Sequence, residues 1–394
     1  MKKILQLRNP FSNLSFLHVI NDGYLASMPL LLPFVQGELG IGFREIGLLG
    51  SILGASGTAL ALPSSWLAKR YGGMRILFVA VFLYSLSFLI VGFSSGFYTL
   101  AAAFFLASIG FGVFHPIGFA LVAGTSDAKA IGKKMGNFTA VGDFGRIGIA
   151  AAVTFFVSII SWRGTAFAYG LTPLVCITFS FFLFRQQGGK PEQPGRQEKN
   201  KAQSLLRNGT FIMMALAGAL DSLASSSLFI FLPFLLLHRG IPTALIGTLS
   251  GAFFAGNLLG KVIIGRFVDR FGGFRVFTIS ELSMAALLVM LALSPSVPAI
   301  IVLSVCLGAL AKGTVPVVTS LVASSVGPEG SLEQAFGVSS FIGSFAGILA
   351  PLAFGFLAAK YGIISVFLFS ACIALSAILP VISIALYSRL KKQP

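Results

Sequence analysis

The chain has 394 residues, of which 56% are hydrophobic and only 10% are charged, and its formal net charge is +16. A soluble domain carries roughly 25% charged residues, so the composition excludes an ordinary soluble protein. The stretches 76–96 and 164–184 contain no charge, and each has about the 20 residues that a helix needs to cross a bilayer. Alternating strands of a membrane barrel are absent from the pattern, which predicts an all-α integral membrane protein.

Hydropathy along the chain predicts twelve transmembrane helices, six in each half. We place them at residues 14–36, 44–68, 76–95, 97–124, 135–160, 164–184, 208–237, 243–265, 274–294, 297–326, 333–359 and 362–388. The polar segment 185–207 is rich in Gln, Gly and Pro, which is typical of a flexible linker. We therefore expect an N-terminal six-helix bundle over 1–184, a linker that is a passive tether rather than a regulatory segment, and a C-terminal bundle over 208–394.

The basic residues are concentrated in alternate loops. The loops of the other set hold only Arg44, Arg163, Arg239 and Lys360. The positive-inside rule then places both termini and the linker in the cytoplasm, in a multi-pass protein of the cell (inner) membrane. The membrane topology thus explains the positive net charge, and we expect no nucleic-acid partner. The first apolar segment reads as a retained span rather than a signal peptide. The three cysteines fall inside predicted spans, in neither a disulfide nor a metal-thiolate pattern.

Segments of the chain repeat at an offset of 200 residues. Residues 70–75 read RYGGMR and residues 270–275 read RFGGFR, and Pro116 returns as Pro316. A common register across separated segments indicates two halves of one design, which in membrane proteins usually enclose a path.

The second copy matches the signature loop of the major facilitator superfamily, in which Gly and Asp precede Arg, an aromatic residue, Gly and Arg. The matching residues are Gly265, Asp269, Arg270, Phe271, Gly272 and Arg275; in the first copy Ser65 and Lys69 replace the Gly and the Asp. The chain therefore resembles this family of transporters over its whole length. The resemblance implies two six-helix pseudo-repeats and a gate built from Arg70, Arg75, Asp269, Arg270 and Arg275. The alternative is that these are ordinary positive-inside loop charges.

Ionisable residues inside predicted spans are few, and such residues usually face a cavity or a partner. In the first half they are Asp22, His115, Asp143 and Arg146. At about 1.5 Å per residue, the first three lie roughly 12–14 Å from the cytoplasmic surface. The family fold places the first, fourth and fifth spans together, so the resemblance implies one polar cluster.

We interpret this cluster as a proton-coupling site of Asp22, Asp143 and His115, with Arg146 and Asn21 meeting the substrate. The alternatives are a fixed internal salt bridge and, for His115 beside Pro116, structural hydrogen bonding. A metal ion at His115 and Asp22 would have too few ligands, and we expect no metal or other cofactor.

In the second half, Asp221 and Lys312 lie near mid-span, and the family fold implies that both face the cavity and bind substrate. Lys261 and Glu281 lie nearer the cytoplasmic ends of their spans. For these two we expect snorkelling or support of the gate.

Three segments resemble the fosmidomycin-resistance branch of drug exporters within the family. They are residues 18–22 (HVIND), 114–116 (FHP) and 142–148 (GDFGRIG). Ile149 stands where that branch usually has Pro, and Asp143 and Arg146 add charge where it is mostly neutral. These departures indicate a charged, anionic substrate.

The resemblance implies a secondary active transporter that works by alternating access. We expect proton-coupled antiport, or efflux, of a small organic compound by a monomer. The alternative is uptake of an organic anion or metal chelate by symport or facilitated diffusion. A third alternative is a receptor or sensor that transports nothing. A long soluble output segment would favour it, and the sequence has only the short polar linker 185–207. An enzyme is not expected, since the sequence shows no nucleophile and base pair and no set of metal ligands.

Overall fold

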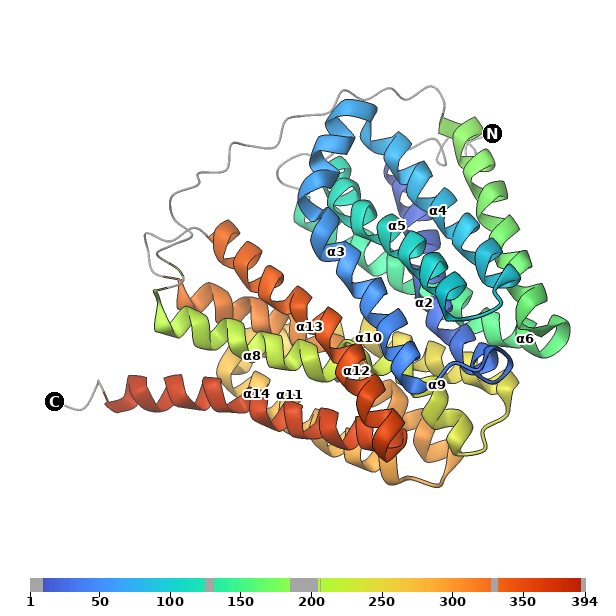
Figure 1. The fold of residues 1–394 in the computed structure, drawn as a ribbon. Coiled ribbons are helices and arrows are strands. Elements are labelled where there is room, and N and C mark those ends of the chain that lie inside the picture. Colours follow the sequence, from blue (N-terminus) through green and yellow to red (C-terminus); the bar gives the residue numbers. More distant parts are fainter. Residues whose placement is uncertain (1–9, 125–130, 185–204, 206, 327–331, 391–394) are drawn as a thin grey trace. The chain divides into compact units, whose positions relative to one another are not determined.

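The computed structural model describes residues 10–124, 131–184, 205, 207–326 and 332–390. In these ranges the chain forms α-helices joined by short turns, and no strand occurs there (Figure 1). The fold class predicted from hydropathy is therefore confirmed as all-α. The chain divides into two compact units: Met1–Gly195 with Pro242–Gly251, and Arg196–Ile241 with Ala252–Pro394. Most of the predicted linker, 185–207, lies outside the described residues.

The first unit contains five long helical elements. They are α2 (Pro10–Leu39), α3 (Phe43–Tyr71), α4 (Gly73–Phe93), α5 (Phe97–Gly124) and α6 (Ile131–Phe184). The last of these is two helices joined at a kink, where Ile160 and Ser161 have non-helical backbone angles. The kink falls between the predicted spans 135–160 and 164–184. The described part of this unit thus supplies six helical spans.

The kink in α6 is held by its own residues and by the end of α2. Ser161 adopts a positive φ of 66°, and its hydroxyl accepts a hydrogen bond from the Gly164 amide at 3.3 Å, as a helix N-cap does. Trp162 Nε1 donates to Glu38 at 2.6 Å, and Arg163 Nη2 donates to the same carboxylate at 2.8 Å. These bonds from Trp162 and Arg163 lower the pKa of Glu38, which lies beyond its predicted span. The two spans of α6 are therefore tied to the end of α2.

Helices α2 and α6 approach each other until their backbones touch. A Cβ at Gly145 would collide with the carbonyl oxygen of Val19, and one at Gly23 would lie 2.8 Å from the carbonyl oxygen of Gly145. Small residues allow such close contact of membrane helices. This glycine contact sets the distance between the two helices that carry Asp22 and Arg146.

The second unit is built from seven helical segments. They are α8 (Gly209–Ser225), α9 (Leu228–His238), α10 (Thr243–Phe271), α11 (Gly273–Leu293), α12 (Val297–Ser325), α13 (Leu332–Tyr361) and α14 (Ile364–Leu390). The first turns of α10 group with the first unit. Helices α8, α11, α12 and α14 surround an apolar core that includes Phe211, Phe277, Leu321 and Val381.

The predicted single span 208–237 is broken at Ser226 and Ser227, which separate α8 from α9. Both residues belong to a run of three serines. The start of α8 is well defined, because the side chain of Asn208 accepts hydrogen bonds from Thr210 N at 3.0 Å and Phe211 N at 3.2 Å. The prediction of one continuous helix was wrong at the break, although α8 and α9 together still form one apolar span.

The repeated glycines have the same backbone conformation in the two copies. Gly72 alone joins α3 to α4 with a φ of 91°, and Gly272 alone joins α10 to α11 with a φ of 80°. Each glycine amide donates to a carbonyl four residues earlier at 2.9 Å. A residue with a Cβ rarely adopts a positive φ, so the first glycine of each repeated pair is explained by a one-residue turn between long helices. The second glycine begins the next helix, where an added Cβ would lie 3.1 Å from Ile117 in the first copy and 3.2 Å from Leu321 in the second.

Nine stretches among the described residues are long and apolar enough to cross a membrane. One of them, Lys134–Ser180, contains the kink of α6 and so includes two predicted spans. The first two predicted spans correspond to α2 and α3, which are 30 and 29 residues long but are not among the nine.

We expect Gly145→Ala to destabilise the protein by about 1–3 kcal/mol, because the added methyl group must push two helix backbones apart. The matched control is Gly148→Ala, one turn along α6, where an added Cβ meets nothing within 4 Å. Thermal unfolding of the purified protein in detergent measures both. Equal midpoints for the two variants would contradict the proposed contact.

Candidate functional site

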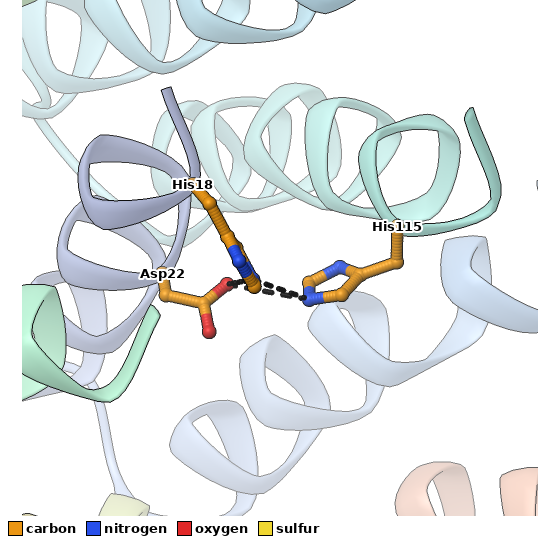
Figure 2. A group of neighbouring side chains, drawn as sticks. All are labelled: His18, Asp22 and His115. Carbon is orange, nitrogen blue, oxygen red and sulfur yellow. Dashed lines mark hydrogen bonds and ion pairs between the residues drawn. The ribbon is translucent and has the colours of Figure 1, made fainter. Parts of the chain in front are cut away.

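Asp22 lies in the interior of the first unit, with only 3% of its surface exposed. Figure 2 shows the carboxylate beside two imidazoles, His18 from the same helix and His115 from α5. Asp22 Oδ1 lies 3.4 Å from Nε2 of each histidine. Its other oxygen, Oδ2, lies 2.7 Å from Arg146 Nη2 on α6. The two carboxylate oxygens therefore face different partners.

Local helix geometry and one glycine place these groups together. His18 and Asp22 are four residues apart and so share a face of α2. A Cβ at Gly142 would lie 2.6 Å from Asp22 Oδ2, so only glycine leaves room for the carboxylate against α6. Arg146 lies one turn further along α6 and also bonds Asp143 at 3.4 Å, within that helix. The predicted grouping of Asp22, His115, Asp143 and Arg146 thus exists in the structure.

The hydrogen bond of His18 identifies which of its ring nitrogens carries the proton. His18 Nδ1 lies 2.8 Å from the carbonyl oxygen of Phe138, and a carbonyl can only accept, so Nδ1 is the donor. In the neutral ring Nε2 is then a lone pair, and it faces the acceptor Asp22 Oδ1 at 3.4 Å. His115 Nε2 lies 3.3 Å from His18 Nε2. A single proton on His115 Nε2 satisfies both acceptors.

Opposite charges meet in this cluster. Arg146 bonds Asp22 at 2.7 Å and Asp143 at 3.4 Å, so one guanidinium serves two carboxylates. Net charge in the interior of a membrane protein is costly, and the guanidinium offsets part of the charge of the two acidic side chains.

Asn21, which was predicted to contact the substrate, bonds other side chains in the interior of the first unit. Its side chain is fully buried, its amide nitrogen donates to Asp22 Oδ1 at 2.9 Å, and its oxygen accepts from the Tyr84 hydroxyl at 3.1 Å. Both ends of the amide are thus engaged inside the protein. The bonds of Asn21 hold it against Asp22 and Tyr84, and its contact with substrate stays a prediction.

The ligand atoms of His18, Asp22 and His115 lie within 4.8 Å of one another, which is the composition of a metal site. The sequence analysis considered only His115 and Asp22; it missed His18, although the four-residue spacing to Asp22 was visible. The guanidinium of Arg146 bonds the same carboxylate at 2.7 Å, and its charge opposes a divalent cation there.

The second unit contains a cavity of about 530 Å³. Its charged lining residues are Asp221 from α8 and Lys312 from α12. Hydroxyl groups line much of the remainder, from Ser222, Ser225, Thr319, Ser339, Ser340 and Ser344. The volume lies in the range of small-molecule sites, roughly 300–1,000 Å³. The structure thus places both substrate-binding candidates of this half on one cavity.

Glu281 was expected to snorkel toward the membrane surface or to support the gate, and its burial contradicts snorkelling. Its side chain is fully buried in α11, and its carboxyl group interacts directly with that of Asp221. The prediction relied on distance along the helix, which does not tell which side of the helix faces lipid. Lys261 is partly buried.

The predicted gate residues are all exposed on the helix ends around the two one-residue turns. Arg70 stacks on the rings of Trp66 and Tyr71, at 5.4 Å from each centroid, and Arg270 stacks on Phe271 at 5.2 Å. Arg75 and Arg275 are exposed at the starts of α4 and α11. Asp269 forms no ion pair with any described residue. A latch formed by these residues stays a prediction.

Comparison with known proteins assigns the family. The model of the Major Facilitator Superfamily matches residues 14–219 and 214–394, which together include both units. The chain belongs to the Major Facilitator Superfamily. Its two similar halves and its one-residue turns at Gly72 and Gly272 thus belong to a transporter fold.

The curated relatives match only part of their own length. A probable 4-methylmuconolactone transporter from Cupriavidus pinatubonensis is 29% identical over 155 residues, which is 38% of this chain and 36% of the relative. The uncharacterized MFS-type transporter YcaD of Escherichia coli is 21% identical over 252 residues, 63% of each chain. The chain thus spans less than two thirds of the length of these relatives.

Solved structures share the fold over almost the whole chain. A mutant of the nucleoside transporter NupG superposes with a TM-score of 0.78 at 14% identity, covering 96% of this chain and 99% of that one. A bacterial homolog of the human lysosomal transporter Spinster gives a TM-score of 0.73 at 15% identity, covering 96% and 95%. At this identity the similarity establishes the transporter fold alone.

We expect Arg146→Met to cost about 3 kcal/mol, since it leaves Asp22 buried without its cation. Adding Asp22→Asn in the same chain should recover part of this loss, because the uncompensated charge is removed. Thermal unfolding of the two single variants and the double variant measures the coupling. Purely additive effects would show that the 2.7 Å ion pair does not couple the two residues.

Proposed function

We propose that this membrane transporter is a proton-coupled secondary transporter of a small organic anion, working by alternating access in the cell (inner) membrane with both termini cytoplasmic. The observation that carries the proposal is the buried Asp22, which lies between a guanidinium on one side and two imidazoles on the other. In this proposal Asp22 takes up the proton with help from His115, and Asp143 keeps part of the charge of Arg146 neutralised.

The ion pair of Asp22 with Arg146 determines how proton and anion affect each other. Arg146 is 20% exposed, so an anion can approach its guanidinium. A carboxylate that bonds Arg146 competes with an anionic substrate for it. Protonation of Asp22 weakens this bond and frees the guanidinium. Proton and anion then bind cooperatively, because each favours the state that the other needs.

Cooperative binding favours co-transport, which was the alternative in the sequence analysis, over the antiport that we expected first. Antiport needs proton and substrate to exclude each other, and an anion bound to Arg146 does not meet that condition. Predicted efflux therefore stays a prediction, as does the resemblance to the fosmidomycin-resistance branch. The partial match to a probable 4-methylmuconolactone transporter is consistent with a small organic substrate.

The cavity of the second unit is, taken by itself, a second candidate site for substrate groups in this proposal. Lys312 offers a positive charge there, and the serine and threonine hydroxyls of the cavity offer hydrogen bonds without a net charge. Asp221 on the same cavity selects against a substrate whose charge is uniformly negative. A compound that combines a carboxylate with hydroxyl or amino groups satisfies this lining.

The test uses a compound that raises the thermal stability of the purified protein in a ligand screen. In proteoliposomes, co-transport predicts accumulation of this compound when the outside is acidic, whereas antiport predicts it when the inside is acidic. Asp22→Asn should lose the response to the pH gradient and still exchange labelled for unlabelled compound.

Gly148→Ala serves as the control, since it alters the same helix without touching the cluster. An Asp22→Asn protein that accumulates the compound under a pH gradient as the unaltered protein does would overturn the role of Asp22. Accumulation with an acidic interior would instead establish antiport.

A further inference from the structure

Two acidic side chains meet in the interior of the second unit, on helices that the Asp22 cluster does not use. Glu281 on α11 is fully buried, and Asp221 on α8 is 5% exposed. Their carboxyl groups are close enough to interact directly. Neither oxygen of Glu281, nor Oδ1 of Asp221, receives a hydrogen bond from an N–H or O–H group of the described residues.

An ionised carboxylate can only accept hydrogen bonds, so two ionised groups at this distance have no bond to make and repel each other. A protonated carboxyl is a donor, and one proton turns the contact into an O–H···O⁻ bond, which is among the strong hydrogen bonds in proteins. The pair then carries one negative charge rather than two in a region poor in water.

The surroundings contain one cation and several neutral groups. Lys312 on α12 interacts electrostatically with Asp221 and lines the same cavity. Thr314 on α12 is fully buried near Asp221, and Ser222 and Ser225 on α8 carry only hydroxyls. The core around α8, α11 and α14 is apolar, with Phe277 and Val381 among its members. Among the described residues, Lys312 is the cation that acts on Asp221, and no cation acts on Glu281.

We propose that Asp221 and Glu281 hold a single proton between them and form a second proton-binding site, separate from the one at Asp22. Asp221 is the member of the pair that faces the cavity, whereas Glu281 lies behind it. When a cationic group in the cavity bonds Asp221, that carboxylate stays ionised and the proton stays on Glu281. When the cation leaves, the proton is shared again. The pair thus links the occupancy of the cavity to the position of a buried proton.

Carbodiimide chemistry tests for this proton directly. N,N′-dicyclohexylcarbodiimide reacts with a protonated carboxyl in an apolar site: the acid proton passes to a carbodiimide nitrogen, the carboxylate oxygen adds to the central carbon, and rearrangement leaves a stable N-acylurea. We expect peptide mass spectrometry to find the adduct on Glu281 near neutral pH, where the exposed Glu38 is ionised and unreactive. Glu281→Gln should abolish labelling of the pair, because the glutamine amide supplies a permanent donor to Asp221.

Infrared spectra of protein carrying ¹³C-labelled glutamate provide a second readout that does not need reagent access. A carbonyl band of a protonated glutamic acid should be present near neutral pH in the unaltered protein and lost in Glu281→Gln, while Glu38→Gln keeps it. Absence of this band from the unaltered protein, together with no adduct on Glu281 or Asp221, would overturn the proposal. Asp22→Asn should change neither readout, so this result is independent of the proposed coupling role of Asp22.

Discussion

The close approach of α2 and α6 is the constraint on which the first unit depends. Gly23 and Gly145 let the two backbones touch, and this contact brings Asp22 within 2.7 Å of Arg146. The same approach requires glycine at position 142, where any side chain would displace the Asp22 carboxylate. Sequence, packing and chemistry are linked here in one direction: small residues permit contact between the helices, and this contact fixes the ion pair of Asp22 with Arg146.

The two units share a backbone design but differ in their interior chemistry. In the first unit an arginine, two carboxylates and two histidines form one connected group. In the second unit a lysine and a carboxylate line a cavity of about 530 Å³, and a second carboxyl is buried behind them. Duplication therefore preserved the one-residue turns at Gly72 and Gly272, while the ionisable groups diverged. Our proposal gives both units a proton, bound by a mixed cluster in one and by a carboxyl pair in the other.

Much of the fold could be predicted because long apolar stretches and repeated glycines report directly on helices and turns. The break at Ser226 and Ser227 could not, since hydropathy does not respond to a local loss of backbone hydrogen bonds. The grouping around Asp22 followed from depth in the membrane and the family resemblance. The burial of Glu281 could not be predicted, because the position of a residue along a helix does not tell whether its side chain faces lipid or the protein interior. His18 and Asn21 needed the actual contacts before their roles around Asp22 could be separated.

The most direct test of the central claim is to measure proton exchange by the purified protein in lightly buffered detergent solution, without a membrane gradient. The account predicts that adding a transported anion causes uptake of protons by the unaltered protein, because freeing Arg146 for the anion favours a protonated Asp22. Asp22→Asn should still bind the anion, seen as a rise in thermal stability, but without the part of the proton uptake that belongs to Asp22. Proton uptake of the same size in both proteins would contradict the claim that Asp22 is the coupling residue.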